Sequence, residues 1–169
     1  MDRDEDDMIF EQGDIEGVVV RPLPKFTDER GWLSEFFRSD ELPYGFLPAM
    51  GYVSMTKAGV ARGPHEHREQ ADLFCFLGPG EFVLALWDNR PNSPTHNKKT
   101  ALFVGEKNPC AVIVPPGVVH GYKCISDGPG WVINCPDQLY KGPGKSQPVD
   151  EIRYEADPDS PFSFDSISQ

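Results

Sequence analysis

The sequence predicts an all-β domain, an antiparallel sandwich or barrel of the jelly-roll type. From residue 52 onward, short apolar or alternating runs are separated by glycine, proline and asparagine, which is the pattern of short strands joined by turns. The chain has 17 prolines and 16 glycines, residues that favour turns over long helices. No strong helical periodicity appears before residue 140. Many short strands without helices are typical of two-layered β architectures.

Length and composition indicate a single domain with its own core. With 169 residues, 38% of them hydrophobic, the chain can bury a core without disulfide or metal staples. We expect an acidic, flexible leader over residues 1–14, because this segment begins M-D-R-D-E-D-D and has little apolar pattern. A single domain is expected over residues 15–169, since neither an internal repeat nor a domain linker is visible.

The first part of the chain predicts two strands and a long loop. The run G-V-V-V at 17–20 predicts a first strand, suited to a sheet edge or to pairing across a dimer. A turn is expected at 27–31, followed by a second strand, W-L-S-E-F-F, at 32–37. Two prolines and a glycine within 39–48 indicate a loop.

Seven further strands are expected after the loop, and they supply most of the predicted core. They lie at residues 52–56, 73–77, 82–87, 102–104, 112–114, 121–124 and 131–133. The tail from Tyr140 is polar and rich in proline and glycine, yet it contains Tyr154, Phe162 and Phe164. We therefore expect this tail to pack back on the barrel.

Charge and cysteine content restrict the partners and the compartment. A formal net charge of -11, without clusters of lysine and arginine, argues against nucleic acid or an anionic membrane as a partner. The N-terminus has neither a basic segment nor an apolar one, and no apolar run is long enough to span a membrane, so we expect a soluble, cytoplasmic protein. The four cysteines, Cys75, Cys110, Cys124 and Cys135, show no C-x-x-C spacing, which predicts buried free thiols.

The segment at 60–72, V-A-R-G-P-H-E-H-R-E-Q-A-D, contains several side chains that could bind a ligand or transfer a proton. Arg62, His65 and His67 adjoin a Gly-Pro step and run into the apolar segment at 73–77. Side chains two positions apart on a strand point to the same face, so the two histidines are expected to share one pocket with the arginine.

Four other polar groups lie at turns where a barrel presents side chains to a ligand. Taken singly, each is also explained as turn chemistry, in which Asp, Ser and Gly satisfy the backbone. They are D-E-R-G-W at 28–32, D-N-R-P-N-S-P-T at 88–95, P-P-G-V-V-H-G-Y at 115–122, and Asp157-Pro158 in the tail.

Taken in order, these motifs resemble the dTDP-4-dehydrorhamnose 3,5-epimerase family, a branch of the cupins. The matching stretches are D-E-R-G-W-L-S-E at 28–35, R-G-P-H at 62–65, D-N-R-P-N-S-P-T at 88–95, P-P-G-V-V-H-G-Y at 115–122, Tyr140, and Asp157-Pro158. The resemblance covers roughly residues 18–164, and the motifs are specific to the family as a set.

The resemblance implies a cupin double-stranded β-helix, a jelly roll that acts as a homodimer without metal or other cofactor. Its implied substrate is a nucleotide-linked 4-keto-6-deoxy sugar, whose carbons next to the ketone are inverted. His65 would be the base that removes the proton, and Asp157 the carboxylate that orients it. Histidine suits this task because its ordinary pKa of about 6.5 lets it accept and return a proton near neutrality.

The remaining roles that the resemblance implies concern substrate binding. Arg62 would face the keto sugar or the diphosphate, and His120 the sugar. Arg30 and Glu35 would contact the nucleotide end. Each of these assignments transfers a family position to the matching residue of this chain.

This chain departs from the family pattern at positions that bear on the reaction. A lysine that usually follows the catalytic histidine is replaced within Q-A-D-L at 70–73. The family's proton-donating tyrosine, six residues before Tyr140, is Asn134 here, and the usual Gln and Asn before the R-G-x-H strand are Met50 and Tyr52. We assign Asn134 and Tyr140 to substrate binding, and inversion at a single centre stays open.

Two alternatives start from the same residues. The pattern Gly59-x5-His65-x-His67-x4-Asp72, with His120 following Pro115-x-Gly117, resembles a metal-binding cupin in which Asp replaces the usual Glu. Three imidazoles and a carboxylate suit Fe(II), Mn(II), Ni(II) or Zn(II). A catalytically silent nucleotide-sugar binder on the same scaffold is the other alternative. The epimerase is favoured over the metal cupin because the motifs at 28–31 and 93–95 have no role in a simple metal cupin.

Overall fold

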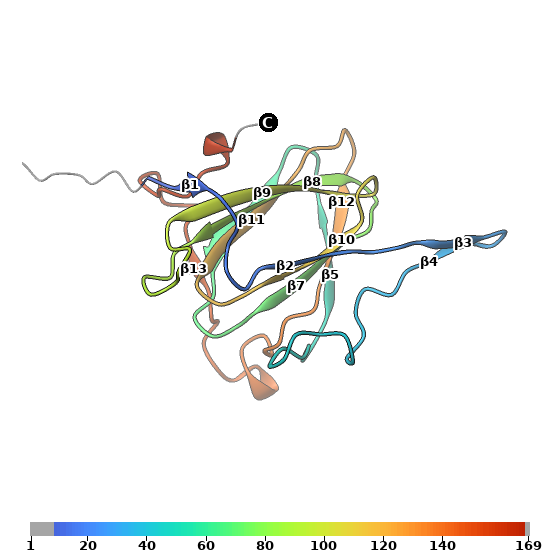
Figure 1. The fold of residues 1–169 in the computed structure, drawn as a ribbon, viewed down its shortest axis with the longest axis horizontal. Coiled ribbons are helices and arrows are strands. Elements are labelled where there is room, and N and C mark those ends of the chain that lie inside the picture. The colour runs from blue at the N-terminus through green and yellow to red at the C-terminus, as the bar shows by residue number, and fades with distance from the viewer. Residues whose placement is uncertain (1–8, 168–169) are drawn as a thin grey trace, which may run out of the picture.

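The protein folds into two β-sheets that face one another, as a computed structural model describing residues 9–167 shows (Figure 1). One sheet has the order β1-β9-β8-β11-β6-β13 and the other β2-β10-β7-β12-β5. The strands of the first are β1 (Glu11–Gln12), β9 (Lys98–Gly105), β8 (Glu81–Asp88), β11 (Val118–Cys124), β6 (Ala61–Glu66) and β13 (Ile152–Arg153). Those of the second are β2 (Val19–Pro22), β10 (Cys110–Val114), β7 (Asp72–Phe76), β12 (Gly130–Asn134) and β5 (Tyr52–Thr56).

A two-stranded ribbon, β3 (Phe26–Asp28) and β4 (Gly31–Leu33), projects from this body (Figure 1). The expected turn at 27–31 is therefore the tip of a hairpin whose first strand the sequence did not reveal. The expected second strand, at 32–37, ends at Leu33. Two short 3-10 helices, η1 (Pro143–Lys145) and η2 (Phe164–Ser166), lie in the tail.

The core lies between the sheets, where the inward side chains of the central strands meet. Its fully buried members include Phe76, Phe82, Leu84, Val112 and Val118. Strands β7 and β10 are buried on their outer face as well, because Leu23 and Phe46 cover it. Continuous apolar runs such as L-F-C-F-L fit this double burial better than simple alternation does.

The C-terminal tail packs against the outer face of the first sheet, as predicted. Phe162 lies 5.9 Å from Trp87 between ring centroids, and Phe164 lies 6.3 Å from it. Tyr154 joins them in the same cluster. The prediction of buried free thiols is also confirmed for all four cysteines.

Part of the segment expected as a flexible leader, residues 1–14, forms a strand. Residues 1–8 lie outside the described residues, but Glu11 and Gln12 form β1, which pairs in parallel with β9. Phe10 stacks at 5.4 Å from Phe162 of the tail. Over residues 9–167, no helix is long and apolar enough to cross a membrane.

Candidate active site

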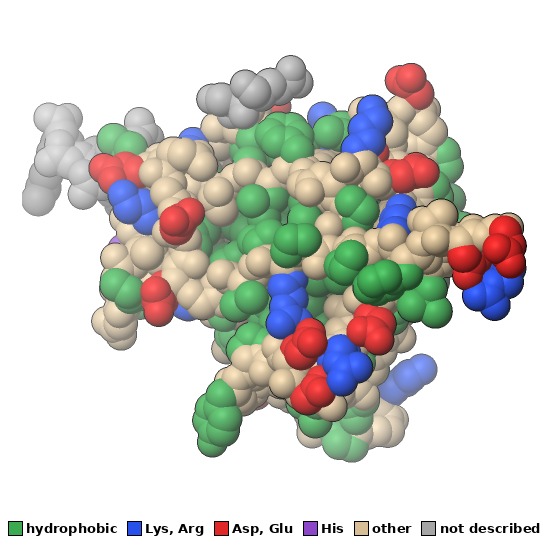
Figure 2. All heavy atoms as spheres, turned by 45° about the vertical axis from the view of Figure 1, so that its right-hand side comes forward, with side chains coloured by type: hydrophobic (Ala, Val, Ile, Leu, Met, Phe, Trp, Pro, Cys, Tyr) green, Lys and Arg blue, Asp and Glu red, His purple; other side chains and the backbone are tan. Residues whose placement is uncertain are grey.

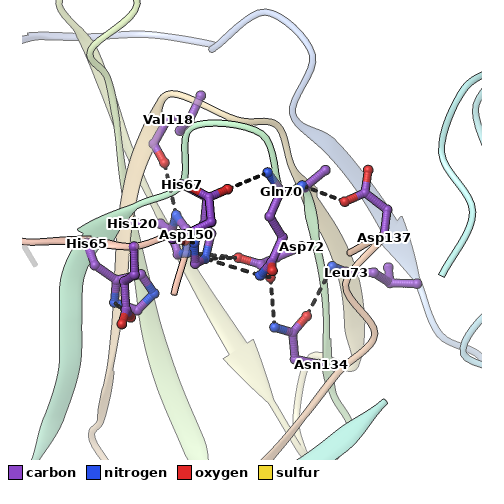
Figure 3. A network of polar contacts seen from close by, with 12 residues as sticks. His65, His67, Gln70, Asp72, Leu73, Val118, His120, Asn134, Asp137 and Asp150 are labelled. Carbon is purple, nitrogen blue, oxygen red and sulfur yellow. Dashed lines mark hydrogen bonds and ion pairs between the residues drawn. The ribbon is translucent and has the colours of Figure 1, made fainter. Parts of the chain in front are cut away.

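Three histidines converge at one end of the barrel (Figure 3). His65 on β6 and His120 on β11 are directly opposite each other in the antiparallel ladder, and their ring centroids lie 4.6 Å apart. His67 follows the end of β6, with its ring 5.5 Å from His65 and 5.6 Å from His120. His65 and His67 therefore lie close together as expected, and His120 lies beside them on the neighbouring strand.

Two glycines allow the strands to come this close. Gly63 has a φ of +84°, and a Cβ there would lie 2.7 Å from the carbonyl oxygen of His120. A Cβ at Gly121 would lie 2.9 Å from the carbonyl oxygen of Arg62. Strands β6 and β11 therefore approach in a way that only glycine permits at these positions. The Gly-Pro step, a pair of residues that usually interrupts a strand, lies within β6.

Asp72, the first residue of β7, is the buried centre of the cluster. Its Oδ2 atom lies 3.0 Å from His67 Nε2 and 3.2 Å from His120 Nε2. Its Oδ1 atom accepts hydrogen bonds from the side-chain amides of Gln70 and Asn134, both at 2.9 Å (Figure 3). The side chain of Asp72 is 1% exposed, so its charge is stabilised by these neighbours rather than by water.

The far side of each imidazole is anchored to the backbone. His120 Nδ1 donates to the carbonyl oxygen of Val118 at 2.9 Å, and His67 Nδ1 donates to the carbonyl oxygen of Asp150. The Asp150 carboxylate in turn accepts from the backbone N–H groups of residues 68, 69 and 70, which fixes the loop after β6. Both Nε2 atoms are consequently directed at Asp72.

Burial and charge give the three ionisable groups different pKa values. Burial and then the neighbouring imidazoles lower the pKa of His65 to about 3, which keeps the ring neutral with a free lone pair. Burial alone would lower the pKa of His67, but contact with the Asp72 carboxylate outweighs it and raises the value to about 9. Burial likewise opposes ionisation of Asp72, yet the two imidazoles hold its pKa well below the usual range.

The carboxylate beside His65 is Glu151, not Asp157. Glu151 Oε1 lies 3.7 Å from His65 Nδ1, and it is brought there because β13 pairs with β6 so that Arg153 is opposite His65. Asp157 is exposed and accepts a hydrogen bond from the backbone N–H of Asp159 at 3.0 Å, closing a turn of the tail. The expected contact of Asp157 with His65 is therefore wrong for this chain.

Arg62 is directed toward β5 rather than toward the histidines. Its Nε donates to Thr56 Oγ1 at 2.9 Å, and its Nη2 donates to the carbonyl oxygen of Met55 at 2.8 Å. These bonds occupy the guanidinium on the edge of the second sheet.

Three other expected site residues do not approach the histidines within this chain. Arg30 pairs with Asp28 at the tip of the β3–β4 ribbon, with 84% of its side chain exposed. Glu35 is exposed beside Arg38, 3.9 Å away, and Tyr140 is exposed in the tail. None of the three contacts the cluster among the described residues.

Tyr52 is a site residue that the motifs did not single out. It is paired with Asn134 in the ladder of β5 and β12, and its hydroxyl accepts a 3.0 Å hydrogen bond from the Asn134 side-chain amide. Asn134 Oδ1 accepts from the backbone N–H of Leu73, which fixes the amide so that its Nδ2 donates to both Tyr52 and Asp72. Burial raises the pKa of Tyr52 to about 12, so the phenol stays protonated.

The face on which Tyr52 lies follows from its strand neighbours. Thr56, on the same face, is buried, and Ser54 hydrogen-bonds the hydroxyl of Tyr122 in the core at 3.1 Å. Val53 and Met55 alternate with them on the other face and are exposed, and Tyr52, at the end of the strand, is itself 47% exposed. Tyr52 thus points between the sheets, at their open end. The pair Tyr52 and His65 comes from opposing sheets, and a ligand between them would have one on each side.

The polar motif at 88–95 has a structural role. The buried carboxylate of Asp88 accepts bonds from Arg90 Nε at 2.8 Å and from the Ser93 and Thr95 hydroxyls at 2.6 Å each. These bonds stabilise the loop between β8 and β9. A loop role of this kind is compatible with any cupin, so this motif does not by itself favour the epimerase over the metal cupin.

Comparison with known families and relatives supports the sequence resemblance. The family model of dTDP-4-dehydrorhamnose 3,5-epimerase matches residues 12–150. The chain is 40% identical over 127 residues, 75% of this chain and 81% of the relative, to the probable low-salt glycan biosynthesis epimerase Agl13 of Haloferax volcanii. It is 36% identical over 121 residues, 70% of this chain and 78% of the relative, to the spore coat polysaccharide biosynthesis protein SpsL of Bacillus subtilis.

Solved structures confirm the predicted cupin jelly roll. The dTDP sugar isomerase of Desulfovibrio desulfuricans superposes with a TM-score of 0.77 at 24% identity, covering 91% of this chain and 94% of that one. The 3'-monoepimerase ChmJ of Streptomyces bikiniensis, solved in complex with dTDP-quinovose, superposes with a TM-score of 0.71 at 20% identity, covering 85% and 72%. At these identities, the likeness establishes the fold.

Proposed function

Because the chain belongs to the dTDP-4-dehydrorhamnose 3,5-epimerase family, we propose that it epimerises a nucleotide-linked 4-keto-6-deoxy sugar through His65. The members of this family are isomerases of sugar biosynthesis. The observation that carries the proposal is the position of His65, a neutral imidazole with Glu151 beside it and Tyr52 on the opposing sheet.

His65 is the proposed base. A proton next to a ketone is removed only when the base is aligned with it and the negative charge that develops is stabilised. The free lone pair of His65 accepts the proton, and the Glu151 carboxylate 3.7 Å from Nδ1 stabilises the imidazolium that forms. Glu151 thus takes the orienting role that the resemblance gave to Asp157.

Tyr52 is the proposed acid. Inversion requires that the new proton arrive on the face of the sugar opposite to the base. Tyr52 and His65 belong to β5 and β6, which lie in the two opposing sheets. The hydrogen bond from Asn134 fixes the phenol, and its raised pKa keeps the proton available for delivery to a strongly basic carbanion. Asn134 is then a positioning residue, and Tyr140 has no part in this assignment.

Deuterium labelling tests the reaction directly. We expect that incubation with dTDP-4-keto-6-deoxyglucose in D₂O will replace hydrogen by deuterium at carbon next to the ketone, because the proton taken by His65 is lost to solvent and any proton delivered from His65 or Tyr52 comes from a group that exchanges with D₂O. Mass spectrometry of the product counts the labels. Two labels indicate that both carbons next to the ketone exchange, and one label indicates that a single carbon does.

The control for this experiment is the UDP-linked form of the same sugar. A label acquired from the dTDP sugar and not from the UDP sugar would support a dTDP-linked substrate, the nucleotide carried by the sugar bound to ChmJ. Absence of label from both nucleotide sugars would contradict the proposed substrate class and would favour a silent binder.

We also propose that the chain acts as a homodimer. The β3–β4 ribbon protrudes with charged side chains at its tip (Figure 2), and it exposes Phe26, Trp32 and Leu33. Arg30 on this ribbon does not reach the histidines of its own chain, but a ribbon of this length can extend onto a second copy. Sedimentation is expected to give twice the 18.9 kDa of one chain, and a monomer at micromolar concentration would contradict the dimer.

A further inference from the structure

The histidine cluster contains more ligand atoms than the proposed proton transfer requires. One ring nitrogen from each of His65, His67 and His120 lies within 4.8 Å of the others, and Asp72 lies against two of them. Proton transfer by His65 with Glu151 uses neither His67 nor His120. Figure 3 shows the His67 and His120 rings beside the Asp72 carboxylate, with the ring of His65 next to them.

Two distances in the cluster match those between neighbouring ligands of one metal ion. Ions bound by histidine and carboxylate at about 2.0–2.2 Å keep neighbouring ligand atoms roughly 3.0–3.5 Å apart. Asp72 Oδ2 lies 3.0 Å from His67 Nε2 and 3.2 Å from His120 Nε2. These two distances therefore need no rearrangement to hold an ion.

Hydrogen-bond donation shows which atoms carry free lone pairs. Because Nδ1 of His67 and of His120 each donates to a backbone carbonyl, the Nε2 atom of each neutral ring has no proton. The Gln70 amide lies 3.3 Å from His67 Nε2, as a donor to such a lone pair would. Two imidazole nitrogens then lie against one carboxylate oxygen, and a cation between them, either a proton on an imidazole or a metal ion in its place, stabilises the arrangement.

Buried atoms without partners point the same way. Asp72 Oδ2 and His120 Nε2 are both buried, and apart from the ion-pair contacts within the cluster neither has a hydrogen-bond partner among the described residues. The two residues are 1% exposed, so water does not replace the missing partner. An ion coordinated by both atoms would satisfy them together.

We propose that His65, His67, His120 and Asp72 bind one divalent transition-metal ion, and that the bound ion inhibits epimerisation. Three imidazoles and one carboxylate select Zn²⁺, Co²⁺ or Ni²⁺ over Mg²⁺ and Ca²⁺, which prefer oxygen ligands. The lone pair with which His65 takes a proton is the one it would give to the ion, so one occupant excludes the other. The inhibition rests on the proposed function, whereas the binding does not.

Cobalt titration tests the binding. Protein dialysed against a chelator and then titrated with Co²⁺ is expected to bind one ion per chain, with the visible absorption of Co²⁺ bound to nitrogen ligands. His67→Ala and the more conservative His67→Gln are expected to lose this binding. His96→Ala is the matched control, because His96 is the only other histidine of the chain and is exposed in the loop between β8 and β9. Circular dichroism confirms that each variant is folded.

The outcomes separate the metal site from the proposed function. Wild-type protein that binds no Co²⁺, or folded His67 variants that bind as much as wild type, would overturn the site. Deuterium exchange is expected to fall as Co²⁺ is added and to return on chelation. Exchange that is undiminished in fully loaded protein would overturn the assignment of His65 as a ligand. Metal-free protein that shows no exchange contradicts the proposed function, and Co²⁺ absorption then still decides the site.

Discussion

Replacement of His65 by asparagine is expected to slow deuterium exchange next to the ketone by about 10²- to 10⁴-fold, the usual contribution of a positioned base. Asparagine keeps a polar side chain at the same place on β6 but has no lone pair of comparable basicity. Glu151, 3.7 Å from the ring, is left without the group that it orients. The measurement is the initial rate of label uptake from D₂O at a saturating concentration of substrate.

The control for this variant is His96→Asn, which makes the same chemical change in an exposed loop. It is expected to exchange at the wild-type rate. His65→Asn must also bind the nucleotide sugar, because a loss of binding would mimic a loss of the base. Exchange by a folded, substrate-binding His65→Asn protein within roughly tenfold of wild type would mean that another group removes the proton.

The histidine cluster could be predicted from the sequence because its determinants are local. His65 and His67 are two residues apart, and the P-P-G turn delivers His120 to the start of a strand. The pairing of β6 with β11 then places His65 opposite His120. This contact joins residues far apart in the sequence, so the family motifs imply it but residue spacing alone does not. For the same reason the apolar runs located most central strands, while short edge strands such as β1 and β13 were missed.

The carboxylate partner could not be predicted because it depends on the path of the tail. Asp157 and Glu151 both lie in a polar segment without periodicity, and only the pairing of β13 with β6 decides which one reaches His65. Nothing in the local sequence distinguishes Glu151 from its acidic neighbours. The position of Arg62 was not predicted for a similar reason. Its guanidinium donates a hydrogen bond to Thr56 on the opposing sheet, and that contact depends on how the two sheets face each other.

Tyr52 could have been found by combining two departures from the family pattern. The sequence has asparagine where the family has its tyrosine, at 134, and tyrosine where the family has asparagine, at 52. These two positions are direct partners in the ladder of β5 and β12. The exchange therefore moves a phenol by one strand and keeps it at the same level of the sheet. Without the register of the two strands, the two departures appear unrelated.

Replacement of Tyr52 by phenylalanine is expected to separate proton exchange from inversion. His65 still removes the proton and returns a deuteron to the same face, so label uptake continues at a rate close to wild type. Delivery to the opposite face loses its donor, and formation of the inverted sugar is expected to fall by about 10²- to 10⁴-fold. Mass spectrometry measures the label and proton NMR of the ring measures the inverted product in the same reaction.

Phenylalanine keeps the ring of Tyr52 on β5 and removes only the hydroxyl that accepts from Asn134, so the barrel is expected to fold. Tyr44→Phe is the matched control, since Tyr44 is fully exposed in the loop before β5, and both of its rates are expected to equal those of wild type. If inversion and exchange fell together, Tyr52 would be needed for binding or for proton removal. If neither changed, the proton on the opposite face would come from another donor, and the two-sided assignment would fail while His65 remained the base.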